Sequence, residues 1–310
     1  MGNRPVDAGL RILGTRMDKS STLPAAVTAS ELDELRTLIE ERSAIFFDAS
    51  RERFFAPRVN EYLRDSGEQN AATLLRRIRN SNAEYDRFLG SLLTQETSFF
   101  RYPDIFQALE RVVLPEVQAR NMWRNPRVLR IWSAGCSTGE EAYSIAITLS
   151  DTLPFPDAWQ IEILATDISR DALQLAERGV YAGRSLASVT PLQLQTHFKK
   201  IGDSWEVKPR LRKMISFVQM NLARSVYVGR MDCIFCMNVL MYFSEERRNE
   251  LLQRFYDTLE PGGLFFLGHS ESMKTAPVKF ETAVHGDCQY YVRPSGSKTE
   301  LKPAALGNGS

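Results

Sequence analysis

The sequence predicts an α/β fold in which an all-helical N-terminal domain precedes a mostly parallel β-sheet covered by helices. Three observations predict this fold. From about residue 28 to 122, apolar residues recur at the spacing of amphipathic helices. After residue 123, short β-rich runs alternate with helical patterns, which is typical of parallel strands joined by crossover helices. Polar residues stand where several of these runs end.

The composition is that of a globular protein. The 310 residues are 43% hydrophobic and 25% charged. A formal net charge of +1 gives no bulk attraction to polyanions, so no nucleic-acid partner is expected. No apolar run approaches the roughly 20 residues of a transmembrane helix, and the N-terminus lacks the apolar stretch of a signal peptide. We therefore expect no insertion into a membrane and a cytoplasmic location.

The cysteines do not predict a disulfide scaffold or a metal site. There are four, and only Cys233 and Cys236 form a C-x-x-C spacing. This pair lies inside an apolar run, without a second ligand pair or a neighbouring histidine. We predict that both are core residues and expect no metal.

The helical domain is predicted to run from 28 to 122. Its first helix begins after Thr28 or Ser30 as the N-cap. Apolar residues then follow at helical spacing, namely Leu32, Leu35 and Leu38 or Ile39. Further helices are predicted at 51–64, 69–79, 82–93 and 103–120. The two chain ends, 1–27 and 294–310, mix Gly, Pro, Ser and Thr and predict flexible tails.

The α/β domain is predicted to span 123–293. Strands are expected near 128–134, 161–166, 214–220, 231–237, 263–269 and 287–293. The helices between them are expected at 140–152, at 169–178 with Ser169 as cap and Gly179 as stop, and at 244–259, ended by "EPGG" (260–263). The polar stretch 197–213 interrupts the alternation and predicts a small inserted hairpin or subdomain.

Four predicted strands end at polar or glycine residues. They are Gly135, Asp167, Asn221 and Asn238. Open parallel sheets bind ligands outside the carboxyl ends of their strands, so these residues predict one shared site. Asp167 suits the two hydroxyls of a ribose. The alternative for Asp167 is a helix cap, a role that Ser169 already fills.

The loop "GCSTGEE" (135–141) indicates which nucleoside binds there. A dinucleotide fingerprint needs a middle glycine and a helix start that accepts phosphate. Here Ser137 replaces that glycine, and Glu140 and Glu141 would repel phosphates. S-adenosylmethionine fits better, because it combines a ribose with a sulfonium and an ammonium group. The alternative is that both glutamates only complement the helix dipole, which we expect of Glu141 but not of Glu140.

Five motifs carry a resemblance to a known family. They are "TSFFR" (97–101), "WSAGCSTGEEAYSIAI" (132–147), "ATDIS" (165–169), "FCMNVLMYF" (235–243) and "LEPGGLFFLGHSES" (259–272). In content, order and spacing they resemble the chemoreceptor glutamate methyltransferase family, CheR. The resemblance covers roughly 28–293.

The resemblance implies a fold and an activity. The fold is a Rossmann-like class I methyltransferase domain, with one antiparallel strand and a small inserted β subdomain, after a helical domain that docks on receptors. The activity is methyl transfer from S-adenosylmethionine to glutamate carboxylates on the cytoplasmic helices of chemoreceptors, which leaves S-adenosylhomocysteine. The residues that match the family's cofactor contacts are Gln95, Thr97, Arg101, Glu140, Asp167, Asn221, Leu222, Met237 and Asn238, beside the loop residue Gly135.

Arg101 and Tyr242 are the catalytic residues that the resemblance implies, because they would flank the transferring methyl. A glutamate acceptor is already ionised at neutral pH, so no strong base is needed. The site must instead align the reacting atoms and exclude water. A guanidinium can hold a carboxylate and leave one lone pair free. The alternatives are a surface arginine after Phe99 and Phe100, and core packing for Tyr242.

Departures from the family pattern keep other functions open. Relatives commonly carry Asn where Gln95 stands and Arg where Met237 stands. One alternative is therefore a catalytically weak module that binds S-adenosylmethionine for signalling. Another is a methyltransferase for a different protein, a small molecule or RNA, although the near-neutral charge argues against RNA.

The resemblance also bears on partners. In the family a basic helix docks on acidic receptor helices. Here the helix 51–64 carries four arginines but also Glu52 and Glu61. It is therefore equally well explained as a docking helix or as a helix face that only contacts solvent. Arg76, Arg77 and Arg79 could extend the basic face. The loop at 199–207 is short and has one glycine, so strong binding of a receptor C-terminal peptide is not expected. We expect a monomer.

Overall fold

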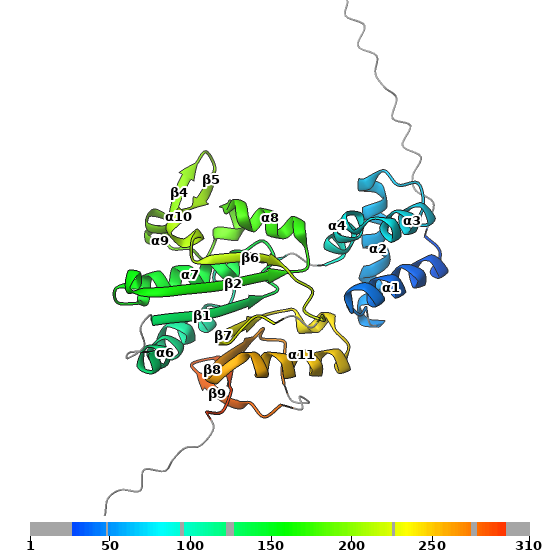
Figure 1. Cartoon of the computed structure of the whole chain (residues 1–310). Helices are drawn as coiled ribbons and strands as arrows, with labels where there is room; N and C mark the ends of the chain where they lie inside the picture. The colour runs from blue at the N-terminus through cyan, green and yellow to red at the C-terminus, as the bar shows by residue number, and fades with distance from the viewer. Residues whose placement is uncertain are drawn as a thin grey trace, which may run out of the picture.

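The computed structural model describes residues 27–47, 49–93, 96–121, 127–224, 227–273 and 278–295. The predicted tails lie almost entirely outside these residues. Four helices form a bundle beside the sheet (Figure 1): α1 (Ala29–Ser43), α2 (Ala49–Ser66), α3 (Ala71–Asn80) and α4 (Asn82–Leu92). Thr28 caps α1 in a capping box with Glu31, because each side chain bonds the other's backbone N–H.

A longer helical segment connects the bundle to the sheet. It consists of α5 (Pro103–Ala108), the π-helical turn η1 (Leu109–Val113) and α6 (Leu114–Asn121). The prediction of one helix over 103–120 is thus confirmed, with a π turn in its middle. No helix among the described residues is long and apolar enough to cross a membrane.

Within the described residues, the main sheet has seven strands in the order β6-β2-β1-β7-β8-β10-β9. They are β1 (Arg127–Ala134), β2 (Trp159–Asp167), β6 (Ile215–Gln219), β7 (Met231–Cys236), β8 (Leu259–Leu267), β9 (Glu281–His285) and β10 (Cys288–Val292). Among the described strands, β10 pairs antiparallel with both of its neighbours, β8 and β9, and the other pairings of this sheet are parallel. This confirms the predicted mostly parallel sheet with one antiparallel strand.

Strand β9 and the start of β8 differ from the sequence prediction. Strand β9 was not predicted, because it is an edge strand whose residues are mostly exposed and which lacks an apolar run. Strand β8 begins at Leu259 and takes in the "EPGG" stretch, which pairs irregularly with β7. The preceding helix α11 (Glu245–Thr258) begins after its cap, Ser244, as predicted.

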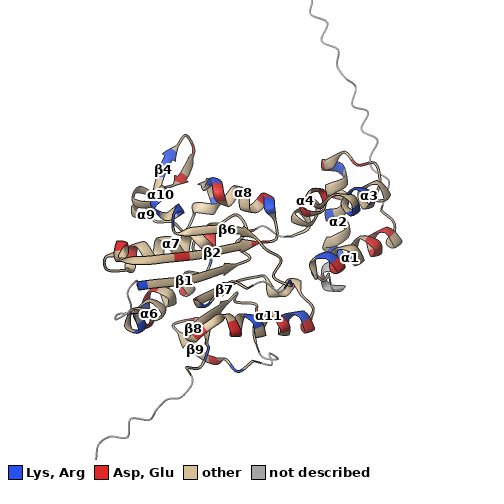
Figure 2. Cartoon of the chain, viewed as in Figure 1, with Lys and Arg blue, Asp and Glu red and all other residues tan. Residues whose placement is uncertain are grey.

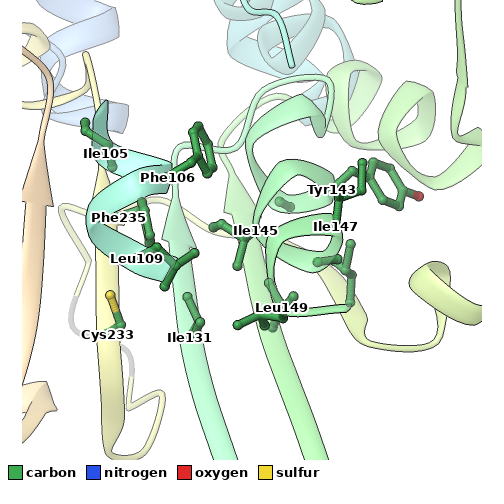
Figure 3. Packing of buried hydrophobic residues seen from close by; sticks show 14 of the residues in the cluster. Ile105, Phe106, Leu109, Ile131, Tyr143, Ile145, Ile147, Leu149, Cys233 and Phe235 are labelled. Carbon is green, nitrogen blue, oxygen red and sulfur yellow. The ribbon is translucent and has the colours of Figure 1, made fainter. Parts of the chain in front are cut away.

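Helices cover both faces of the sheet. On one face α7 (Glu140–Thr152) and the α5–α6 segment pack around Ile131 (Figure 3). On the other face Trp132 packs against Phe255 of α11 and joins the core of the helical bundle. Side chains alternate along a strand, so Cys233 and Cys236 lie in these two different cores. Both are buried free thiols, as predicted.

A small second sheet is inserted after α8 (Arg170–Arg178), in the order β3-β5-β4. Its strands are β3 (Val180–Tyr181), β4 (Phe198–Ile201) and β5 (Ser204–Val207). The predicted insertion at 197–213 contains β4, β5 and the short helix α10 (Pro209–Arg212). The third strand comes from just after α8, and α9 (Pro191–His197) precedes β4.

The helical bundle is fastened to the carboxyl ends of the strands. Gln219 at the end of β6 donates to Asp86 of α4, at 3.0 Å. The N–H of Phe46, just after α1, donates to the carbonyl of Tyr242, at 2.8 Å. The bundle therefore lies next to the edge of the sheet where parallel α/β proteins bind ligands.

Candidate active site

One pocket lies at the carboxyl ends of β1, β2 and β7, and Ile45 and Leu93 of the helical domain also line it. Most of the residues singled out from the sequence meet in this pocket. They are Thr97, Arg101, Gly135, Asp167, Asn221, Leu222, Met237, Asn238 and Tyr242. Gln95 lies outside the described residues, and Glu140 is not among the lining residues.

The loop after β1 is shaped by Gly135. Its φ of 88° is left-handed, and a Cβ there would lie 2.3 Å from Cγ2 of Val239. Its N–H and that of Cys136 donate to the carbonyl of Thr166, at 2.7 and 2.9 Å. The glycine thus allows the ends of β1, β2 and β7 to approach closely.

We expect Gly135→Ala to lower the free energy of unfolding by about 2–4 kcal/mol, from left-handed strain plus overpacking. Affinity for S-adenosylhomocysteine, the product that the family resemblance implies, should fall as well, because Val239 lines the pocket and must move. Chemical denaturation and calorimetry measure the two effects. Gly202→Ala is the matched control, since its φ is 57° with nothing within 4 Å of an added Cβ. An equal loss of stability in both variants would contradict the packing part of this prediction.

Asp167 joins the ends of two strands. Its Oδ2 accepts from the N–H of Ser137 and its Oδ1 from the N–H of Ser169, both at 2.8 Å. Ser169 itself caps α8 by accepting from Ala172, so Asp167 is not the cap. Burial raises the pKa of Asp167, and the backbone donors oppose this shift. Each carboxylate oxygen keeps acceptor capacity toward the pocket.

The positions of the two glutamates are the reverse of the expectation. Glu140 is buried, and its two oxygens accept from Thr138 Oγ1 at 2.6 Å and from Ser185 Oγ at 3.0 Å. Glu141 lines the pocket and accepts from Ser133 Oγ at 2.6 Å. Consecutive helical residues point about 100° apart, so only one of the two can face the pocket.

The environment of Glu141 is electrostatically unusual. Burial raises its pKa to about 7, and the nearby carboxylate of Glu271 acts in the same direction. The hydrogen bond from Ser133 and the positive charge of Arg101 oppose the shift. A cation bound in the pocket would therefore find a carboxylate poised to ionise near neutral pH.

Arg101 follows two anchored phenylalanines. Phe99 is buried against Tyr181, with ring centroids 4.9 Å apart. The N–H of Phe100 donates to Ser144 Oγ at 3.0 Å. Arg101 is exposed and lines the pocket, with Nη1 donating to the carbonyl of Glu96 at 2.8 Å. The anchors fix the backbone from which the guanidinium reaches the pocket mouth.

The loop after β7 supplies a third side of the pocket. Met237 is buried, and Asn238 has a left-handed φ of 61°. The short 3₁₀ turn η4 (Leu240–Tyr242) then brings half-buried Tyr242 to the pocket. Asn221 and Leu222 come from the loop after β6, where Arg254 Nη1 donates to the carbonyl of Leu222 at 2.8 Å.

Sequence reasoning missed two residues of this region. Tyr102 lines the pocket, and its hydroxyl donates to Asn238 Oδ1 at 2.7 Å. Glu271 accepts from the N–H of Asn238, also at 2.7 Å. A signal was present for Glu271, because it follows the end of β8, a strand end that was not considered with the other four.

Fold and site together define a class I methyltransferase, with a glycine loop after the first strand and a carboxylate at the end of the second. Residues 95–287 match the family model described as "CheR methyltransferase, SAM binding domain". The chain is 32% identical to chemotaxis protein methyltransferase 2 of Vibrio cholerae, over 89% of this chain and 97% of that one. It is 33% identical to the chemotaxis protein methyltransferase of Escherichia coli, over 82% and 88%. The chain belongs to the CheR methyltransferase family and is an S-adenosylmethionine-dependent methyltransferase.

Proposed function

We propose that this protein transfers the methyl group of S-adenosylmethionine to glutamate side-chain carboxylates on the cytoplasmic helices of chemoreceptors. The observation that carries the proposal is that Asp167, Arg101 and Tyr242, from three distant segments, line one pocket. The match to chemotaxis protein methyltransferases over most of their lengths supports this function over the two alternatives, a catalytically weak cofactor-binding module and a methyltransferase for another acceptor. The proposal implies work in the cytoplasm, where the acceptor helices lie.

The pocket residues fit S-adenosylmethionine. Asp167 would hold the ribose hydroxyls and Glu141 the ammonium group, and Met237 and Leu222 offer apolar surface to the base. Ser137 Oγ is buried and has no hydrogen-bond partner within the described part of the chain, so a ligand at this wall would satisfy it. When bound, S-adenosylmethionine supplies an electrophilic methyl group on its sulfonium.

The protein's part in the reaction is orientation and exclusion of water. Arg101 would hold one oxygen of the acceptor carboxylate and leave the other free to attack in line. Tyr242 would pack beside the reacting atoms. Ile45 and Leu93 line the pocket from the helical domain and would keep water away. No group has to remove a proton, since a glutamate is ionised at neutral pH.

The helical domain, 28–122, is proposed to dock on the receptor. Figure 2 shows basic and acidic residues interspersed on its helices. Arg77 pairs with Glu68 and Glu84, and Arg79 pairs with Glu34 at 2.6 Å, so these two arginines are engaged within the domain. Fewer arginines are therefore available to contact a receptor than the sequence of this domain indicates.

The first test is transfer of radiolabelled methyl to membranes that contain the organism's own chemoreceptors. For carboxyl methylation we expect label that alkali releases as volatile methanol. The Arg101→Ala variant should not introduce this label. If the protein binds S-adenosylhomocysteine but the membranes carry no label, the catalytically weak module or another substrate would be favoured. Alkali-stable label would contradict ester formation.

The raised pKa of Glu141 predicts a pH dependence of cofactor binding. Below about pH 7 the carboxyl group is protonated in the free protein and cannot attract an ammonium group. Affinity for S-adenosylhomocysteine should therefore fall as the pH is lowered from 8 to 6, and binding near pH 7 should release protons. Calorimetry in buffers of different ionisation enthalpy measures this release. In Glu141→Gln the affinity should be lower and almost independent of pH; an unchanged pH dependence would contradict the assignment.

A further inference from the structure

The carboxylate of Glu271 collects backbone N–H groups from two strand ends. Its Oε2 accepts from Asn238 at 2.7 Å and from Gly268 at 3.0 Å, and its Oε1 accepts from Met241 at 3.3 Å. Asn238 and Met241 follow the last paired residue of β7, so the sheet provides no acceptor for their N–H groups. Glu271 takes the place of the missing strand partner.

This contact holds a left-handed piece of backbone. Asn238 has a φ of 61°, a conformation that asparagine tolerates better than other non-glycine residues. The Tyr102 hydroxyl holds Asn238 Oδ1 from the other side. Asn238 Nδ2 has no hydrogen-bond partner among the described residues, so it is left as a donor for a ligand in the pocket.

The contact also depends on Gly268. A Cβ at this position would lie 3.0 Å from Asn238 N, Asn238 Nδ2 and Glu271 Oε2. The close approach of the β8 end to the loop after β7 therefore needs a residue without a side chain. Burial raises the pKa of Glu271, and the loop N–H groups oppose this shift, as expected for a carboxylate that is held by donors.

We propose that Glu271 is a positioning residue for the methyl donor: its carboxylate fixes the loop 237–242 and thereby sets Asn238 and Tyr242 at the pocket. This inference rests on the proposed use of the pocket for S-adenosylmethionine. Glu271 acts through the loop and does not line the pocket itself.

The test is Glu271→Gln in the full chain. The variant keeps the shape of the side chain but turns one acceptor oxygen into an NH₂ group that opposes backbone donors. We expect the Kd for S-adenosylhomocysteine, measured by calorimetry, to rise roughly tenfold or more. The KM for S-adenosylmethionine should rise in parallel, while the KM for receptor stays unchanged. A purely structural role would lower the active fraction and kcat and leave both KM values as they are.

Two further variants complete the experiment. Gly268→Ala perturbs the same contact from the opposite side and should give the same selective loss. Asp232→Asn is the matched control, because Asp232 is a buried carboxylate at the other end of β7 that accepts from Arg130 N at 3.0 Å. Equal Kd values for wild type and Glu271→Gln, or an equal loss in Asp232→Asn, would overturn the inference. A wild-type protein that binds no S-adenosylhomocysteine would instead refute the proposed cofactor site, and the inference with it.

Discussion

Replacement of Arg101 by alanine is expected to lower kcat for receptor methylation by roughly 100-fold or more. The reason is that the guanidinium orients an acceptor carboxylate, and loss of a charge-assisted pair or of alignment costs about two powers of ten. Arg101 is exposed at the pocket mouth, so its removal should leave the free energy of unfolding almost unchanged. Arg101→Lys should recover only part of the rate, because an ammonium cannot hold a carboxylate with a planar fork.

Arg111→Ala is the matched control for this prediction. Arg111 is also an exposed arginine, with a side chain 69% exposed, on the helical segment that follows Arg101, and it does not line the pocket. Initial rates at saturating S-adenosylmethionine and receptor measure the effect directly. Similar rates for the two alanine variants would show that Arg101 has no role in the reaction and is an ordinary surface arginine.

The positions of most site residues followed from the sequence because parallel strands bring their carboxyl ends to one edge. Asp167 is the last residue of β2, and Gly135, Asn221 and Asn238 follow directly or almost directly after β1, β6 and β7, so topology alone brings them together. The strands themselves were recognisable as short apolar runs. The edge strand β9 was not, because exposure removes the apolar signal.

The choice between Glu140 and Glu141 could not be made from the sequence. Both occupy the first turn of α7, and the dipole of the helix favours a negative charge at either. Which one faces the pocket depends on the direction in which the loop enters the helix, which the left-handed Gly139 and the hydrogen bonds to Thr138 and Ser185 determine.

The contributions of Tyr102 and of the helical domain to the pocket could not be predicted from the sequence either. The hydrogen bond from Tyr102 to Asn238 joins residues 136 positions apart. Ile45 and Leu93 reach the pocket only because the bundle is fastened to the strand ends. Such long-range contacts leave no periodic or local pattern in a single sequence, whereas a motif such as "ATDIS" marks its own place at a strand end.

Replacement of Asp167 by asparagine is expected to raise the Kd for S-adenosylhomocysteine by roughly 100-fold. Two effects combine: the variant loses a charged acceptor for the ribose hydroxyls, and its NH₂ group must oppose the N–H of Ser137 or Ser169. The second effect also displaces the glycine loop, since the Ser137 bond ties that loop to the end of β2. Calorimetry at pH 8, where Glu141 is ionised, isolates the contribution of Asp167.

Asp151→Asn separates this effect from a general loss of stability. Asp151 lies in the last turn of α7, away from the pocket, and pairs with His197 at 2.6 Å. Its replacement should change thermal stability more than cofactor affinity. Asp167 accepts hydrogen bonds from backbone N–H groups, so its role could be purely structural. In that case Asp167→Asn would lower the stability, while the protein that still folds would bind S-adenosylhomocysteine normally. A selective loss of affinity, with folded protein verified by circular dichroism, is the result that assigns a role in cofactor binding to this side chain.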